Sequence, residues 1–167
     1  GIIGFEKYEA LAERVGKATS ARREKATALR DRLDQATWVG DDELAAAGEA
    51  MMLAKKGGLD LAQAFHAIAA SSGNSFVHET ETQLVLSGSY NIGFTMDLAL
   101  KDLGFALGMG KEFGVPLDLA AIVTQAFIRG KAAYGGDAWS TQLIKLLEDV
   151  TDTPLRAEGF PETLAPA

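Results

Sequence analysis

Lys101 and Asp102 stand side by side in a segment with helical periodicity, and Asp97 lies four residues before Lys101. The spacing and order of Asp97 and Lys101 are those of a surface salt bridge worth a few tenths of a kcal/mol. Adjacent helical residues point about 100° apart, so Lys101 and Asp102 cannot both lie on one solvated face. We therefore expect one of the two to approach a neighbouring element, a partner chain or a ligand.

A second candidate is the polar turn Ser71–Ser75, which reads Ser-Ser-Gly-Asn-Ser. Serine and asparagine side chains stabilise free helix ends, so the simpler interpretation is a capped connection between two helices. The two histidines, His66 and His78, lack the four-residue spacing of a helical metal site, and we predict no metal. The sequence has no cysteine, which excludes disulfides, thiol catalysis and zinc–thiolate sites.

No glycine-rich loop for nucleotide phosphates is present in the sequence. The segment Gly1–Gly4 is too short and follows no strand, so it does not make a dinucleotide fingerprint. The net charge of −7 argues against a nucleic-acid partner. No apolar run reaches the roughly 18–20 residues of a membrane span, and no signal peptide pattern is present. We expect no membrane association and, by default, a cytoplasmic location.

The 167 residues, 47% of them hydrophobic and 23% charged, predict one globular domain. Alanine and leucine dominate and strand signals are scarce, so the predicted class is all-α with seven or eight helices. The predicted helices cover Phe5–Val15, Ser20–Gln35, a segment from Asp41 or Asp42 to Lys56, Asp60–Ala70, Phe76–Val85, Thr95–Phe113, Asp118–Tyr134, and a last segment from Asp137 to Val150. The tail, 151–167, is predicted to be extended against a surface or disordered.

Helix-boundary residues and apolar stripes give further expectations. Asp60 is a candidate N-cap, and either Asp41 or Asp42 is expected to cap the helix that follows Gly40. The segment Thr95–Phe113 is predicted to be the central helix because its apolar stripe is the most regular, formed by Met96, Leu100, Leu103 and Leu107. Gly104 and Gly108 lie one turn apart on this helix and are expected to let another backbone approach closely.

Five short motifs occur in an order and spacing that resemble the 3-hydroxyisobutyrate dehydrogenase family. Together they cover about residues 40–150. They are Glu49-Ala50 with Leu53-Ala54 and Gly58-Leu59-Asp60; the turn Ser71–Ser75; Phe94 with Lys101-Asp102-Leu103; Gly114-Val115-Pro116-Leu117; and Gly136-Asp137 with Trp139-Ser140.

The resemblance implies a multi-helix C-terminal domain of the 6-phosphogluconate/3-hydroxyisobutyrate dehydrogenase type. In such enzymes a Rossmann domain, absent from this sequence, binds most of the NAD or NADP, and the helical domain closes the active site and dimerises. The resemblance implies that Phe94 and Asp102 line the cleft in which substrate and cofactor bind. It also implies that Lys101 reaches the cofactor. Ser72 and Gly73 are implied to border the same cleft.

The first 39 residues match the family poorly. The family's catalytic lysine position falls on Leu33 and its asparagine position on Thr37, and neither side chain can transfer a proton. Lys17 or Lys25 could serve only in a different alignment, so the catalytic residue is left unassigned. The expected organisation is a poorly matching helical segment over 1–39, the dehydrogenase C-terminal domain over 40–150, and a tail over 151–167.

The sequence therefore predicts the C-terminal domain of an NAD(P)-dependent β-hydroxyacid dehydrogenase. The parent enzyme would act on a small hydroxyacid and its semialdehyde, and the chain alone would be inactive. A homodimer is expected. The alternative is a non-catalytic helical domain for oligomerisation or partner binding.

Overall fold

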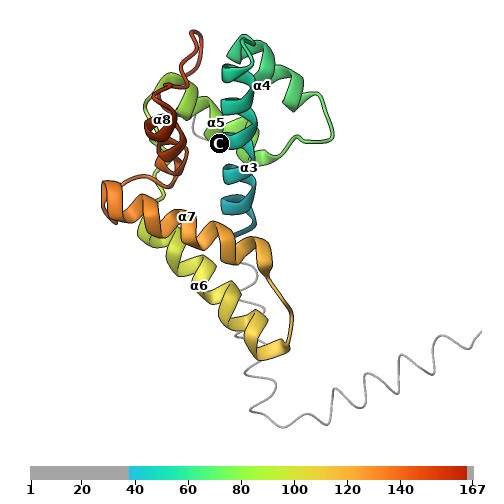
Figure 1. Ribbon diagram of the computed structural model, residues 1–167, viewed down its shortest axis with the longest axis vertical. Helices are drawn as coiled ribbons and strands as arrows, with labels where there is room; N and C mark the ends of the chain where they lie inside the picture. The colour runs from blue at the N-terminus through green and yellow to red at the C-terminus, as the bar shows by residue number, and fades with distance from the viewer. Residues whose placement is uncertain (1–37, 165–167) are drawn as a thin grey trace, which may run out of the picture. The chain divides into compact units, whose positions relative to one another are not determined.

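The computed structural model describes residues 38–164, so Leu33 and the two helices predicted before Gly40 lie outside the described residues. The helices are α3 (Trp38–Lys56), α4 (Leu61–Ala69), α5 (Phe76–Ser87), α6 (Met96–Phe113), α7 (Asp118–Tyr134), the 3₁₀-helix η1 (Ser140–Leu143) and α8 (Lys145–Thr151) (Figure 1). Residues 38–164 contain no strand, which confirms the all-α class. None of these helices is long and apolar enough to cross a membrane.

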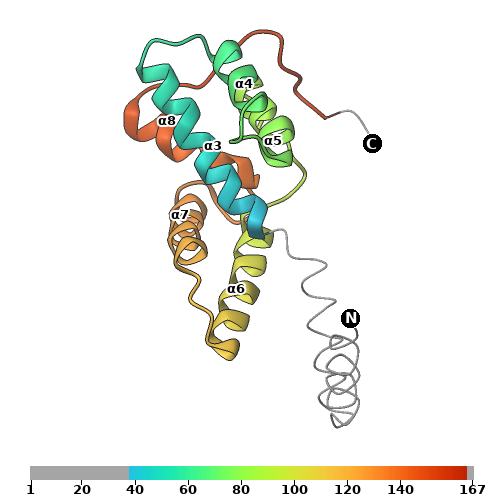
Figure 2. The ribbon, with the colours of Figure 1, turned by 90° about the vertical axis from the view of Figure 1, so that its right-hand side faces the viewer.

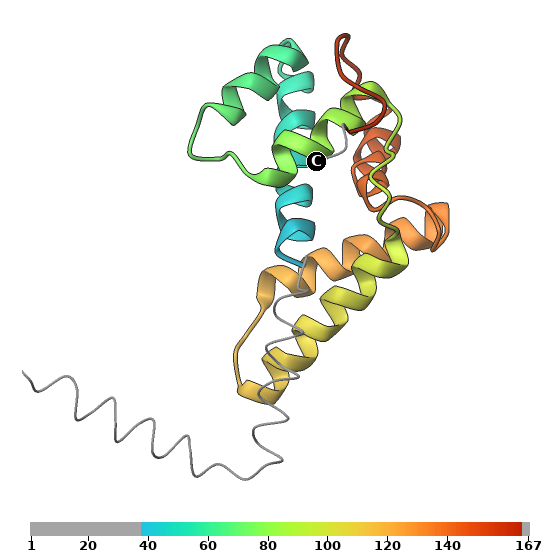
Figure 3. The same cartoon turned by 180° about the vertical axis from the view of Figure 1, so that it is seen from behind.

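Helix α3 is the central element, because it contacts α4, α5, α6, α7, η1 and α8. Figures 2 and 3 show α3 between the α4–α5 pair and the α6–α7 hairpin. Its buried face carries Leu44 and Met51, each 1% exposed, and Gly48, where a Cβ atom would lie 2.6 Å from Ile144. The prediction that the helix after Thr95 is central was wrong, since α6 packs mainly on α7.

Side-chain caps fix the starts of three helices. Asp60 Oδ1 accepts a hydrogen bond from Gln63 N at 2.9 Å, as predicted, and Ser75 Oγ accepts one from His78 N at 3.0 Å. Thr95 caps α6 in the same way. The turn Ser71–Ser75 is thus a capped connection. Asp41 caps no helix, because α3 already begins at Trp38, and the same holds for the alternative, Asp42.

The predicted helix beginning at Asp137 is also wrong. The structure has η1 from Ser140 and then α8. The backbone before η1 bonds to the start of α6 instead: Met96 N donates to Ala138 O at 2.8 Å, and Ser140 N donates to Phe94 O at 2.8 Å. These hydrogen bonds between distant segments use backbone N–H and C=O groups that a helix over the same residues would need for its own hydrogen bonds.

The α6–α7 hairpin is packed through small residues. Met96 and Leu103 are fully buried, whereas Leu100 and Leu107 are only half-buried. The buried face of α6 therefore differs from the predicted stripe and includes alanines. The close approach occurs at Gly130 of α7, where a Cβ atom would lie 2.9 Å from Met96 Cε. Within the described residues nothing lies within 4 Å of the corresponding positions on Gly104 and Gly108, so this part of the chain does not supply the backbone that was expected to approach there.

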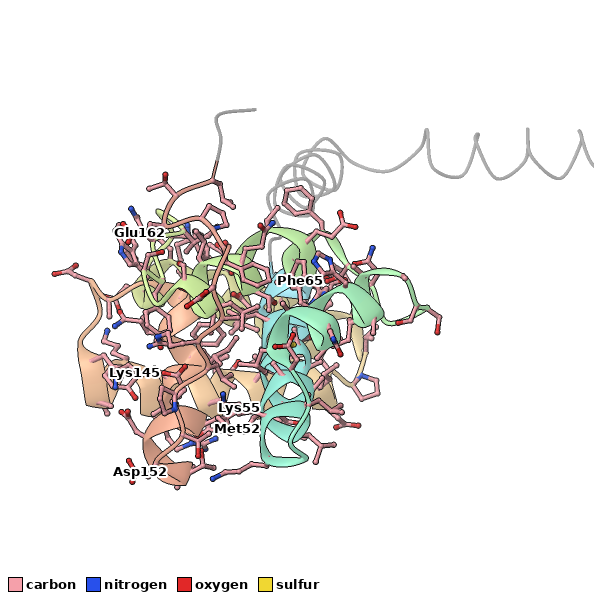
Figure 4. The ribbon with its side chains drawn as sticks, turned by 90° about the horizontal axis from the view of Figure 1, so that it is seen from above. Met52, Lys55, Phe65, Lys145, Asp152 and Glu162 are labelled. Atoms are coloured by element: carbon pink, nitrogen blue, oxygen red, sulfur yellow. The ribbon has the colours of Figure 1, made fainter. Side chains whose placement is uncertain are left out.

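The residues after α8 cross back over α5 and α4, from Asp152 to Glu162 (Figure 4). Leu155 is fully buried, and Ala157 N donates to Leu86 O at 3.0 Å. The Phe160 ring meets Phe65 of α4 edge-on, with centroids 5.1 Å apart. The tail is therefore extended against a surface over its described part, as one of the two predicted alternatives states.

Candidate functional site

The loop between α5 and α6 positions Phe94. Tyr90 and Gly93 both have positive φ, 55° and 75°, which turns the chain sharply before α6. Phe94 is half-buried against the core, and its carbonyl oxygen accepts the hydrogen bond from Ser140. The aromatic ring is thus fixed immediately before the helix that carries Lys101 and Asp102.

Lys101 and Asp102 form an ion pair, with Lys101 Nζ 3.3 Å from Asp102 Oδ1. The side chain of Lys101 is 52% exposed, whereas that of Asp102 is 12% exposed. The predicted pair between Asp97 and Lys101 is not the one the structure forms, because Asp97 Oδ1 lies 2.5 Å from Lys131 Nζ of α7. Asp102 is the more buried of the two adjacent residues, and its charge contributes to the raised pKa of Asp41 on α3.

The charges of carboxyl groups on α5 and α6 act on a buried carboxyl group of α3. Asp41 of α3 is 5% exposed, and its Oδ2 has no hydrogen-bond partner. Burial raises the pKa of Asp41 to about 8, and the charges of Glu81, Asp102 and Asp42 add to the effect. Burial also raises the pKa of Glu81 on α5 to about 7. Carboxyl groups with such pKa values hold and release protons near neutral pH, as acid–base groups do.

Sequence reasoning missed Asp41 and Glu81 as candidate site residues. A signal for Asp41 was present: it lies in phase with the buried positions Leu44, Gly48 and Met51 of α3. An acidic residue in phase with an apolar stripe is rarely buried without a partner or a function. A similar signal was present for Glu81, which lies four residues after Val77 and three before Leu84, both buried in α5.

The other two predicted cleft residues, Ser72 and Gly73, lie elsewhere among the described elements. They are exposed and line a pocket of about 360 Å³ that is bounded by α3, α4 and α5. Phe94, Lys101 and Asp102 do not line this pocket. Within residues 38–164 no group of three histidine or acidic side chains is arranged to hold a metal ion.

Comparison with known families matches residues 42–147, well over half of the chain, to the "NAD-binding of NADP-dependent 3-hydroxyisobutyrate dehydrogenase" family. The 2-(hydroxymethyl)glutarate dehydrogenase of Eubacterium barkeri is 39% identical over 109 residues, which are 65% of this chain and 36% of that protein. The L-threonate dehydrogenase of Cupriavidus necator is 32% identical over 115 residues, 69% of this chain and 38% of that protein.

Among solved structures, the 3-hydroxyisobutyrate dehydrogenase of Salmonella typhimurium superimposes with a TM-score of 0.64 and 29% identity. The match covers 71% of this chain and 41% of that one. The chain thus spans less than half the length of the relatives it matches. The matched residues include the whole of α6 with its Lys101–Asp102 pair, and the described fold agrees with a dehydrogenase structure. The chain therefore belongs to the 3-hydroxyisobutyrate dehydrogenase family, of which it carries the helical domain.

Proposed function

We propose that this chain is the helical, cleft-closing domain of an NAD(P)-dependent β-hydroxyacid dehydrogenase. The Lys101–Asp102 pair carries the proposal, because it combines an exposed cation with a nearly buried carboxylate within the matched region, on the helix that Phe94 precedes. The named substrates of two relatives, 2-(hydroxymethyl)glutarate and L-threonate, are hydroxylated acids. We assign the same substrate class, a small hydroxyacid or its semialdehyde, to the parent enzyme.

The residues present fit one edge of a dinucleotide. An exposed ammonium group such as that of Lys101 binds phosphate or carboxylate oxygens, and the half-buried ring of Phe94 offers an apolar surface at the start of the same helix. NAD or NADP, when bound, accepts or donates a hydride. The sequence carries no phosphate-binding glycine loop, so a Rossmann domain would hold most of the cofactor. In this proposal Asp102 keeps the Lys101 side chain oriented. The assignment of Ser72 and Gly73 to the border of the cleft rests on the family resemblance alone.

A homodimer is part of the proposal. The hairpin between α6 and α7 exposes large apolar side chains near its tip, namely Phe113, Val115, Leu119 and Ile122, which are 53–67% exposed. Such a patch is typical of a surface that another protein covers. The open faces of Gly104 and Gly108 on α6 would let a second backbone come close. The cytoplasmic location suggested by the sequence belongs to the same proposal.

The deciding experiment is turnover by the polypeptide that contains this chain together with a nucleotide-binding half. A panel of small β-hydroxyacids is tested with NAD and with NADP, and reduced cofactor is measured by its fluorescence. Oxidation of at least one hydroxyacid is expected. No turnover across the panel, together with no cofactor binding, would favour the alternative of a non-catalytic oligomerisation or partner-binding domain. A reading frame with no strand–GxGxxG–helix segment upstream of Gly1 would favour the same alternative.

A further inference from the structure

A second pocket, the α8 pocket, is bounded by α3, α7, η1 and α8. It measures about 380 Å³, and small-molecule sites in proteins occupy roughly 300–1,000 Å³. None of the residues assigned to the dehydrogenase cleft lines it, neither the Lys101–Asp102 pair and Phe94 nor Ser72 and Gly73. The proposed enzyme activity therefore leaves the α8 pocket without a role.

The floor of the α8 pocket is an apolar stripe. Its members recur at helical spacing along η1 and α8, and they are Leu143, Leu146, Leu147 and Val150. Leu143 is 5% exposed and Val150 is 79% exposed, so the stripe leads from the core to the surface. Ile144 completes the floor and packs on α3, where a Cβ atom on Gly48 would lie 2.6 Å from it.

Polar contacts hold α8 against both walls of the pocket. On the side of α3, Lys56 Nζ donates to the carbonyl oxygen of Thr151 at 3.0 Å. On the side of α7, the hydroxyl of Tyr134 donates to Asp149 Oδ2 at 2.6 Å. The stripe on α8 is thus fixed between α3 and α7, and the shape of the pocket follows from the fold.

The two walls carry opposite charges. Glu49 lies one turn after Ala45 on α3, Arg129 lies three residues after Ala126 on α7, and all four line the pocket. This spacing places each charged side chain on the same helix face as an alanine. Glu49 and Arg129 are exposed, and within residues 38–164 neither side chain forms an ion pair or a hydrogen bond. Both charges are therefore available to a ligand.

This pair of charges selects the ligand by its own charge. An anion is attracted by Arg129 and repelled by Glu49, whereas the reverse holds for a cation. A zwitterion is attracted by both residues. A guanidinium group binds a carboxylate through two parallel hydrogen bonds, which favours a carboxylate at Arg129 and an ammonium group at Glu49. The apolar floor favours an aliphatic group on the same molecule.

We propose that the α8 pocket binds a free amino acid with a branched aliphatic side chain. The carboxylate of the ligand pairs with Arg129, its ammonium group pairs with Glu49, and its side chain packs on Leu146 and Leu147. The hydroxyacids proposed as dehydrogenase substrates have no ammonium group and so lack the contact with Glu49. This binding needs neither the dinucleotide nor Lys101, so it stands or falls separately from the proposed enzyme activity.

The test uses the full 167-residue chain with ¹³C-labelled isoleucine and valine methyl groups, and nuclear magnetic resonance. The probes are L-leucine; 4-methylpentanoate, which lacks its ammonium group; 3-methylbutylamine, which lacks its carboxylate; and glycine, which lacks its side chain. L-leucine is expected to shift the methyl resonances of Ile144 and Val150, and to bind at least about tenfold more tightly than each of the other three. Ile68 of α4 does not line the pocket and should not move.

Two variants separate the charged contacts. Glu49→Gln should bring the affinities for L-leucine and 4-methylpentanoate close together, and Arg129→Gln should do the same for L-leucine and 3-methylbutylamine. Glu162→Gln, at an exposed site in the tail, should leave both preferences unchanged. Unshifted Ile144 and Val150 resonances with L-leucine overturn the proposal. Binding of 4-methylpentanoate, 3-methylbutylamine or glycine as tight as that of L-leucine, or preferences that survive both variants, overturn it as well.

Discussion

Lys131 Nζ lies 2.5 Å from Asp97 Oδ1, which ties the last turn of α7 to the first turn of α6. This pairing between helices takes the place of the local pair that the spacing of Asp97 and Lys101 suggests. Lys101 is left beside Asp102, with its ammonium group half in solvent. Lys131 and Lys101 thus have separable tasks, since Lys131 links the two helices and Lys101 is available to a ligand.

Replacing Lys101 with alanine is expected to lower kcat/KM of the parent enzyme by about tenfold or more, or about 1.4 kcal/mol, because the cofactor loses a charged contact. The free energy of unfolding should change by less than about 0.5 kcal/mol, since Lys101 is half-exposed. Steady-state kinetics and urea unfolding measure the two effects.

Asp97→Ala and Lys131→Ala are the matched controls, because they remove an exposed ion pair on the same hairpin. Both should leave kcat/KM nearly unchanged. Equal small effects of Lys101→Ala and Asp97→Ala on kcat/KM would show that Lys101 does not contact the cofactor in the cleft.

The isolated 167-residue chain is expected to show no hydroxyacid turnover with NAD or NADP. The sequence has no phosphate-binding loop, and the family's lysine position falls on Leu33. Cofactor fluorescence over a long incubation at high chain concentration measures the activity. Reproducible turnover by homogeneous chain would contradict the prediction and would point to an unassigned acid–base group.

The chain is expected to sediment as a homodimer at tens of micromolar. Ile122→Glu, which places a charge on a 67% exposed apolar side chain of α7, should shift the equilibrium to monomer. Leu53→Glu is the control, since Leu53 is 75% exposed but lies on α3, outside the hairpin. A wild-type monomer, or equal effects of the two variants, would argue against dimerisation through the hairpin.

Asp41→Asn is expected to change how stability depends on pH. Burial, with help from the charges of Glu81, Asp102 and Asp42, raises the pKa of Asp41 from 3.8 to about 8, so the folded chain holds a proton that the unfolded chain releases. This contribution to stability is fully present below about pH 4 and is lost as the pH rises toward 8. The neutral asparagine does not lose this contribution. The free energy of unfolding of the variant should therefore exceed that of wild type by at least about 1 kcal/mol near pH 9.

Urea unfolding across this pH range measures the difference, and Glu162→Gln at an exposed position serves as the control. A wild-type chain whose stability follows the same pH curve as Asp41→Asn would show that Asp41 holds no unusual proton.

Arg156→Ala is expected to lower the free energy of unfolding by about 2–3 kcal/mol. Arg156 Nη1 lies 2.8 Å from Glu148 Oε1, and Nη2 donates to the Tyr90 hydroxyl at 2.8 Å, while Glu148 is only 5% exposed. Without the guanidinium group, the buried carboxylate of Glu148 keeps its charge but loses its cationic partner. The estimate is at the low end because Arg156 itself is 40% exposed.

Glu148→Gln added to Arg156→Ala should restore part of the loss, because it removes the uncompensated charge. Lys145→Ala breaks an exposed pair with Asp149 and should cost less than about 0.5 kcal/mol. Urea unfolding of the four chains tests the set, and a double variant less stable than Arg156→Ala would refute the buried-charge explanation.

Local signals predicted the helix boundaries well where a side chain caps the helix or a glycine ends it. Asp60 and Gly114 mark such boundaries, and both lie where the structure has them. The last predicted helix failed because the backbone near Ala138 bonds to Met96, a contact between distant segments that no local pattern reveals.

The candidate site was predictable only in part. The motif that contains Lys101 and Asp102 could be recognised because it lies within a few residues of one helix. The sequence places Glu81 in phase with apolar residues, but the raised pKa of its carboxyl group depends on burial produced by tertiary packing. In the same way, the partner of Asp97 lies on α7, so its choice of Lys131 over Lys101 follows from the tertiary fold.

The crossing of the tail over α5 has a consequence for biosynthesis. Leu155, Ala157 and Phe160 cover core surface that belongs to α4 and α5. On the ribosome, α4 and α5 emerge long before these three residues do, so that surface stays uncovered until synthesis of this region is nearly finished. Newly made α4 and α5 therefore expose apolar surface during translation until the tail can pack on it.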